Sequence, residues 1–315
     1  MTNYCTLFDS NYLTRGVAMY QSLKKYTNKF HLYIFAFDEN CYNLLKELDL
    51  EFVTIISLNE FEDEELLKVK NYRSSGEYCW TCTPSIIKYA IENYNLQSCT
   101  YVESDIFFFS DPLLLIEEIG DKSVLITEHR YTPEYDKSSS SGKYCVQFMT
   151  FKNDTNGIKV LNWWRESCIT WCYARLEDGK FGDQKYLDDW ITRFEGIHVL
   201  NHLGGGVAPW NIQQYKLEEN PFELVFYHFH GLKFLLRNKI DLGGYKLRKE
   251  DIKILYKPYL SHLEKIKDNI SVIDSSYDYH GTSFLKKDWK TPFRYLNRLI
   301  KKSYTIYDRK YISRL

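Results

Sequence analysis

The chain has 315 residues, of which 44% are hydrophobic and 26% charged, so it is long enough to bury one large core or two modest ones. Its 41 basic and 42 acidic residues give a net charge of -1, which offers no general attraction to nucleic acid, and we expect no nucleic-acid partner. No apolar run reaches the roughly 18 to 20 residues that a membrane-spanning helix needs.

Eight cysteines are scattered through apolar runs, and the N-terminus has no basic segment followed by an apolar one. Cys79 and Cys82 have the spacing of a redox or zinc pair, but no second pair follows at the distance that a zinc site needs. We therefore expect buried, reduced thiols in a cytoplasmic protein.

Short apolar runs alternate with segments of helical spacing along the first part of the chain. Residues 4–8, 31–37 and 52–56 are predicted strands, and residues 16–25 and 42–48 are predicted helices. This alternation predicts an α/β fold with a mostly parallel sheet flanked by helices.

Two carboxylates stand within the apolar run at residues 99–109. In an extended segment residues i and i+2 point to the same side, so Glu103 and Asp105 are expected to present their oxygens together. Such hard oxygen ligands suit Mg²⁺ or Mn²⁺ carrying a diphosphate. The alternative is a pair of solvated acids at the end of a strand.

Further polar residues stand at the ends of predicted elements later in the chain. Glu128 follows the strand predicted at residues 123–127, and the serine-rich residues 138–142 predict a mobile loop over the site or a disordered insertion. Asp183 and Gln184 open a predicted helix, where Asp183 is also a good N-cap.

An apolar strand at residues 224–230 brings His228 and His230 to one face, and Gly231 and Lys233 follow it. A single histidine on a strand is usually structural. His228, however, would complete a ligand set with the two carboxylates of the acidic run.

These motifs occur in the order found in glycosyltransferases of the GT-A fold. The chain resembles the family of glycogenin and the bacterial lipooligosaccharide galactosyltransferases, glycosyltransferase family 8. Four elements carry the resemblance: the Asp-x-Asn-Tyr loop at 9–12, the acidic pair at 103–105, the Asp-Gln pair at 183–184 and the His-to-Lys segment at 228–233. The resemblance covers roughly residues 3 to 238.

The resemblance implies a role for each motif. Tyr12 would stack on the uracil of a UDP sugar while Asp9 and Asn11 fix the base, and Asp183 and Gln184 would line the transferred sugar. The implied ligands of Mn²⁺ or Mg²⁺ are Glu103, Asp105 and His228. The implied nucleotide-binding residues are Asp9, Asn11, Tyr12, Gly231 and Lys233.

Three departures from the family's pattern stand out. Glu103 replaces the first Asp of the acidic element, and Lys233 comes one residue early, with Phe and Leu at residues 234–235 in place of Pro-Trp. The family's arginine at the start of the helix predicted at residues 80–94 is missing. Arg73 and Lys88 are the candidate cations to replace it.

We expect residues 1–238 to form the catalytic domain and residues 239–315 a mostly helical extension. Residues 286–315 contain ten Lys or Arg against two acids, interspersed with aromatics. This composition is typical of a segment attracted to an anionic membrane surface, here residues 284–315, and the alternative is a solvated helix docked on the domain.

The sequence thus predicts a metal-assisted glycosyltransferase, on or near the inner face of the membrane, that moves a sugar from a nucleoside diphosphate to an acceptor hydroxyl. A glycan, lipid-linked or protein acceptor in cell-surface glycan or lipopolysaccharide assembly is expected. The resemblance implies retention at the anomeric carbon. The alternatives are an inverting enzyme with Glu128 as the base, and a non-catalytic carbohydrate-binding protein on the same fold.

Overall fold

The computed structural model describes residues 1–284, 291–301 and 303–314. Its main sheet has seven strands in the order β3-β2-β1-β4-β7-β6-β8. Only β7 runs antiparallel to its neighbours, so the predicted α/β fold with a mostly parallel sheet is confirmed. The strands are β1 (Thr2–Phe8), β2 (Phe30–Ala36), β3 (Val53–Ser57), β4 (Ser98–Val102), β6 (Val124–Glu128), β7 (Tyr144–Lys152) and β8 (Ile197–Val199).

Helices cover both faces of this sheet because successive side chains of each strand point in opposite directions. Tyr4 of β1 belongs to the core that includes α1 (Leu13–Tyr26) and α2 (Glu39–Glu47). Cys5, the next residue, belongs to the core that includes α5 (Ser75–Asn93) and α8 (Thr155–Thr170). The remaining helices of this part are α3 (Leu58–Phe61), α4 (Glu64–Lys70), α6 (Leu113–Glu117), α7 (Ser138–Ser141) and α9 (Trp190–Arg193), with 3-10 turns at Ser10–Tyr12, Pro133–Tyr135, Gln184–Asp189, Ile212–Gln214 and Leu217–Glu219.

Local sequence explains where the helices begin. The carboxylate of Asp38 accepts the Cys41 backbone N–H at 2.7 Å and so caps α2. Ser74 and Glu77 form a capping box at the start of α5. All eight cysteines are free thiols and seven are buried, which confirms the expectation of core cysteines.

The acidic run is not extended throughout, contrary to the prediction. β4 ends at Val102, and the backbone N–H of Ile106 donates to the carbonyl of Glu103 at 3.2 Å, which turns the chain. The strand β5 (Ile106–Phe108) then leaves the main sheet and pairs antiparallel with β9 (Phe226–His228). Glu103 therefore begins a turn that contains Asp105, and β5 needs this turn to reach β9.

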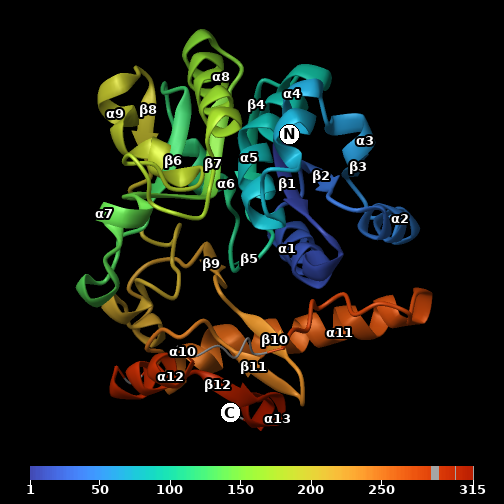
Figure 1. The fold of residues 1–315 in the computed structure, drawn as a ribbon, viewed down its shortest axis with the longest axis vertical. Helices are drawn as coiled ribbons and strands as arrows, with labels where there is room; N and C mark the ends of the chain where they lie inside the picture. The colour runs from blue at the N-terminus through green and yellow to red at the C-terminus, as the bar shows by residue number, and fades with distance from the viewer. Residues whose placement is uncertain (285–290, 302, 315) are drawn as a thin grey trace.

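The C-terminal elements lie together on one side of the main sheet, at the bottom of Figure 1. They include an antiparallel sheet of β10 (Lys233–Leu235), β11 (Lys239–Asp241) and β12 (Ile306–Asp308). The helices are α10 (Lys249–Asp251), a π-helical turn (Ile252–Tyr256), α11 (Lys257–Ile273), α12 (Thr291–Ile300) and α13 (Arg309–Arg314). The boundary expected after residue 238 falls between β10 and β11, so this small sheet continues across it.

The end of the chain is part of this packed unit. β12 pairs with β11, and Arg298 and Arg309 form ion pairs with Asp241 and Glu264 at 2.8 and 3.0 Å. Part of the basic charge counted in the sequence is therefore balanced within the protein. Residues 285–290, 302 and 315 of the segment expected at a membrane surface lie outside the described residues. None of the helices in the described ranges is long and apolar enough to cross a membrane.

Replacing Ile312 by Ala should destabilise the fold by about 2 kcal/mol or more, because its side chain is only 1% exposed and its removal leaves a cavity. Chemical denaturation measures this loss. The control is Ile300→Ala, since Ile300 is 72% exposed and its truncation should change stability by less than about 0.5 kcal/mol. Equal effects of the two substitutions would mean that the C-terminal helix does not pack as described.

Candidate functional site

The loop after β1 is held in a single conformation by two carboxylates. Asp9 accepts the backbone N–H of Asn11 at 3.0 Å and its side-chain amide at 3.1 Å. Asp38, the N-cap residue of α2, accepts the backbone N–H of Ser10 at 2.8 Å and also its hydroxyl. The loop therefore presents the partly exposed ring of Tyr12 from a fixed backbone.

Arg15 is a buried cation next to this loop that the sequence analysis missed. Its guanidinium donates to the carbonyls of Asn11, Leu232 and His280 at 3.2, 3.3 and 3.0 Å. It also lies 4.5 Å from the centre of the Tyr12 ring, within cation–π range. Arg15 thus connects the loop after β1, the segment after β9 and the C-terminal part of the chain.

His228 and Asp105 meet at the end of the β5–β9 pair. The Nε2 atom of His228 lies 3.0 Å from Oδ1 of Asp105, and Nδ1 donates to Oε1 of Gln147 at 2.9 Å. Because Nδ1 keeps its proton and donates it in a hydrogen bond to Gln147, Nε2 faces the carboxylate either as an imidazolium N–H or as a lone pair with a cation between them. Burial opposes ionisation of Asp105, but the charge and hydrogen bond of His228, together with the charges of His230 and Arg15, lower the pKa of that carboxyl below its usual value.

Two more carboxyls stand close to this pair. Burial, followed by the charges of Asp105 and Asp183, raises the pKa of Glu103 well above its usual range. Burial raises the pKa of Asp183 to about 7. The Oδ2 atom of Asp183 is buried and has no hydrogen-bond partner among the described residues. The predicted N-cap role of Asp183 is absent, since its side chain makes no cap hydrogen bond.

These groups fit a divalent cation, although no three His, Cys, Asp or Glu side chains within the described ranges form a ready ligand set. Neighbouring ligands of an octahedral ion with bonds of about 2.1 Å lie about 3 Å apart, which matches the separation of His228 and Asp105. A cation would also offset the burial and the repulsion by Asp105 and Asp183 that raise the pKa of Glu103. Asp105 and His228 are therefore the two best-placed ligands, with Glu103 beside them.

Gln184 and its neighbours hold the serine-rich segment. The amide of Gln184 donates to the carbonyl of Ser141 at 2.7 Å, and Lys185 donates to that of Ser138 at 3.1 Å. This segment forms the short helix α7 instead of the mobile or disordered loop expected from its composition. The side chain of Gln184 is thus engaged with α7.

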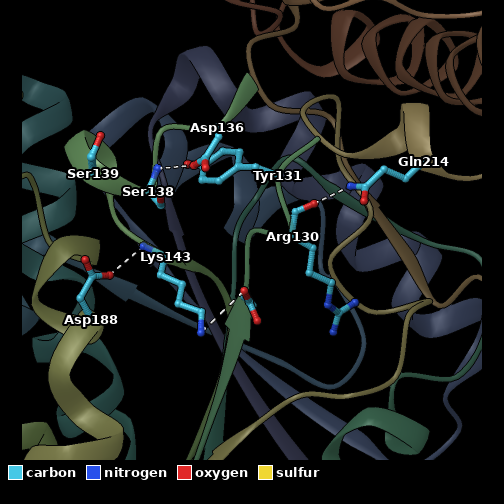
Figure 2. A pocket seen from close by; sticks show the side chains of 9 residues that line it. Arg130, Tyr131, Asp136, Ser138, Ser139, Lys143, Asp188 and Gln214 are labelled. Atoms are coloured by element: carbon cyan, nitrogen blue, oxygen red, sulfur yellow. Dashed lines mark hydrogen bonds and ion pairs between the residues drawn. The ribbon is translucent and has the colours of Figure 1, made fainter. Parts of the chain in front are cut away.

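Glu128 lies at the end of β6 in a polar pocket of about 650 Å³, 3.9 Å from the ammonium of Lys143. Figure 2 shows Lys143 and Asp188 on one side of this pocket and Arg130 and Gln214 on the other. Arg130 is occupied by backbone carbonyls, including those of Leu200 and Gly205 at 2.6 and 3.0 Å. The lining residues are Glu128, Arg130, Tyr131, Asp136, Ser138, Ser139, Lys143, Asp188 and Gln214.

The segment after β9 is placed by close backbone packing. Gly231 has a φ of +77°, and a Cβ on it would lie 3.3 Å from the Cα of Gly243, so glycine suits this turn. Lys233 is exposed on β10. The two cations considered for the missing arginine bind α8 instead, Arg73 through the carbonyl of Ile169 and Lys88 through the side chain of Asn162.

Known structures define the class of the fold. The chain is similar to the galactosyltransferase LgtC, solved with donor and acceptor sugar analogs, with a TM-score of 0.52, 10% identity, and 84% of this chain and 96% of that chain covered. It is similar to the glycosyltransferase GlyE of Streptococcus pneumoniae TIGR4, with a TM-score of 0.51, 10% identity and coverage of 88% and 65%. It is also similar to the bifunctional glycosyltransferase WbbM, with a TM-score of 0.55 and 12% identity. That match covers 87% of this chain and 52% of the WbbM chain. The protein has the fold of GT-A glycosyltransferases.

Sequence comparison then gives the family. No family model matches the chain. It is 32% identical over 304 residues to the uncharacterized protein YfnD of Bacillus subtilis (strain 168), covering 90% of this chain and 95% of the relative. It is 29% identical over 301 residues to the uncharacterized protein YfnF of the same organism, covering 90% of this chain and 98% of YfnF. The chain belongs to the family of YfnD.

Asp183→Asn should stabilise the metal-free protein increasingly as pH rises from about 4 to 7. The folded-state pKa of about 7 lies above the ordinary value of 3.8. Ionising this buried carboxyl therefore lowers the stability of the wild-type protein progressively between these two pH values, and the full loss is reached above the folded-state pKa. Melting temperatures in EDTA should show a difference of several degrees at pH 8 and almost none at pH 4. Asp121→Asn, at an exposed position, is the control. A difference independent of pH would contradict the raised pKa.

Proposed function

We propose that this protein is a glycosyltransferase that moves a sugar from a nucleoside diphosphate, with UDP as the expected nucleotide, to an acceptor hydroxyl. The observation that carries the proposal is the contact of Asp105 with His228, close enough to the Asp9–Tyr12 loop for the charge of Asp105 to raise the pKa of Tyr12, after burial. A metal-binding pair next to a loop with a stacking ring is an arrangement suited to a nucleotide diphosphate. The fold, shared with known glycosyltransferases, supports the same activity.

The roles of the chain's own residues follow from their places. Tyr12 offers its ring to the base, while Asp9 and Asn11 offer hydrogen-bonding groups to the base or ribose. Asp105 and His228, with Glu103, would hold Mn²⁺ or Mg²⁺. When bound, that ion neutralises negative charge on the departing diphosphate. Gly231 and Lys233 are proposed at the diphosphate, Gly231 through its backbone and Lys233 through its charge.

Asp105→Asn and His228→Ala should each lower hydrolysis of the donor sugar by about 100-fold or more, because each removes a metal ligand. A screen of nucleotide sugars with the wild-type protein identifies the donor, and the two variants are then compared on it. Asp121→Asn, at an exposed position that is not among the residues proposed to bind the metal or the donor, should keep full activity. Full activity of either the Asp105→Asn or the His228→Ala variant would contradict the assignment of that residue as a metal ligand.

The stereochemical course depends on which carboxyl acts on the sugars. We favour retention, with Asp183 and Gln184 at the transferred sugar, because the buried Oδ2 of Asp183 has no hydrogen-bond partner in the described part of the chain. An inverting reaction would use Glu128, which lines the polar pocket, as the base that deprotonates the acceptor. The anomeric configuration of the product, determined by NMR, should be that of the donor, and an inverted product would favour Glu128.

A non-catalytic carbohydrate-binding protein is the second candidate function. It is favoured by two observations: Gln184 is engaged with Ser141, and Glu103 stands where glycosyltransferase family 8, which the sequence resembles, has Asp. Donor binding without any hydrolysis or transfer would support this candidate over the enzyme.

We also propose that α12 docks on an anionic membrane surface, so that the acceptor is a lipid-linked or cell-surface glycan made at the inner leaflet. Its apolar residues recur with helical spacing, and each is more than half exposed: Phe293, Leu296, Leu299 and Ile300. The exposed Lys301 follows directly, and basic side chains near such a face add attraction to anionic lipid.

The double variant Phe293→Glu/Leu299→Glu should lose most of its flotation with anionic liposomes at low salt, because it places charge on the apolar face. Point variants are preferable to truncation, since truncation would remove the paired strand β12. Val272→Glu, at an 87% exposed position of α11, is the matched control. Equal recovery of both variants and the wild-type protein would rule out docking through α12.

A further inference from the structure

Residues 277–281 of the C-terminal part lie directly on the start of α1. The backbone N–H of Thr14 donates to the carbonyl of Tyr279 at 3.3 Å, and the Thr14 hydroxyl is hydrogen bonded to Nδ1 of His280 at 2.9 Å. Arg15 donates to the carbonyl of His280 at 3.0 Å. The segment therefore adjoins the loop that presents Asp9, Asn11 and Tyr12, although more than 260 residues separate the two in sequence.

The approach of this segment to the loop is close enough to require glycine. Gly281 has a φ of +61°, and a Cβ on it would lie 2.7 Å from the backbone oxygen of Asn11. Backbone thus packs against backbone here, with no room for a side chain or a water molecule between them. A displacement of residues 277–281 would therefore move Asn11.

One side chain of the segment reaches the functional group of the loop. The hydroxyl of Tyr277 donates to Oδ1 of Asn11 at 3.1 Å, while Nδ2 of Asn11 donates to Asp9 at 3.1 Å. The amide is therefore held at both ends, and its orientation is fixed. One N–H of Nδ2 and one lone pair of Oδ1 remain for a ligand.

The Tyr277 side chain is also accessible at this position. It is 38% exposed, and its ring lies 5.0 Å from that of Tyr279, which supports it from the protein side. Tyr279 is in turn buried and hydrogen bonded to Asp274. Tyr277 is thus a supported aromatic residue at the edge of the loop, and not part of the apolar core.

We propose that Tyr277 is a positioning residue of the nucleotide site, which orients the Asn11 amide toward the nucleoside half of the donor. The inference rests on the proposed function, because it assigns a ligand to the Asp9–Tyr12 loop. It also gives the C-terminal part of the chain a role in donor binding. Tyr277 acts through Asn11, so its loss should affect binding of the base and ribose and leave the diphosphate contacts unchanged.

Calorimetric titration with UDP and with UMP, both in the presence of Mn²⁺, tests this role. Tyr277→Phe should weaken the binding of both ligands by the same factor, about three- to tenfold, because the Asn11 amide loses one of the two hydrogen bonds that orient it. Tyr72→Phe, which removes a hydroxyl from a highly exposed tyrosine after α4, should bind as the wild-type protein does. An unchanged melting temperature of the unliganded Tyr277→Phe protein checks that the fold is intact.

A double-mutant cycle with Asn11→Ala separates positioning from a general effect. If Tyr277 acts through Asn11, then Tyr277→Phe should cost no further affinity in the Asn11→Ala background. The same loss in both backgrounds would overturn the inference, as would wild-type affinity of the single Tyr277→Phe variant. If the wild-type protein itself binds neither UDP nor UMP, the proposed function fails, and the role of Tyr277 fails with it.

Discussion

The short pairing of β5 with β9 is the constraint on which the site depends. Ile106 pairs with His228, and this register places the imidazole against Asp105, the residue that precedes the strand. Two segments more than 100 residues apart thus meet through main-chain hydrogen bonds. Tyr259 of α11 stacks on Phe229 with ring centres 3.7 Å apart, so the C-terminal part buttresses the same pair. A rigid backbone on both sides keeps the histidine and the carboxylate in place.

The electrostatics of the site favour a cation. Asp105 is ionised beside His228, while burial and mutual repulsion oppose ionisation of Glu103 and Asp183. In such surroundings, ionised carboxyls destabilise the folded protein unless a cation binds next to them. Arg15 lies close enough to lower the pKa of Asp105, yet its hydrogen bonds go to backbone carbonyls. Under the proposed function, the metal and donor would arrive together as the balancing partners.

Sequence patterns predicted the parallel sheet well because each strand is a short apolar run bounded by turn residues, as at residues 31–37. The turn at Glu103 was not predictable, because it depends on β9, a partner far along the chain. Arg15 was missed because it lies within the helical pattern of α1, and only the tertiary fold reveals its three carbonyl partners. From sequence, the basic tail could be either a membrane-surface segment or a helix docked on the domain, because the acids that pair with Arg298 and Arg309 become neighbours only in the folded extension.

The central claim is that Asp105, His228 and the Asp9–Tyr12 loop together bind a metal and a nucleoside diphosphate. Thermal unfolding of the wild-type protein with UDP, with Mn²⁺, and with both tests it most directly, because a ligand that binds only the folded state raises the melting temperature. The account predicts that the two ligands together raise the melting temperature by several degrees, and by more than either ligand alone. An unchanged melting temperature with both ligands at millimolar concentration would contradict it.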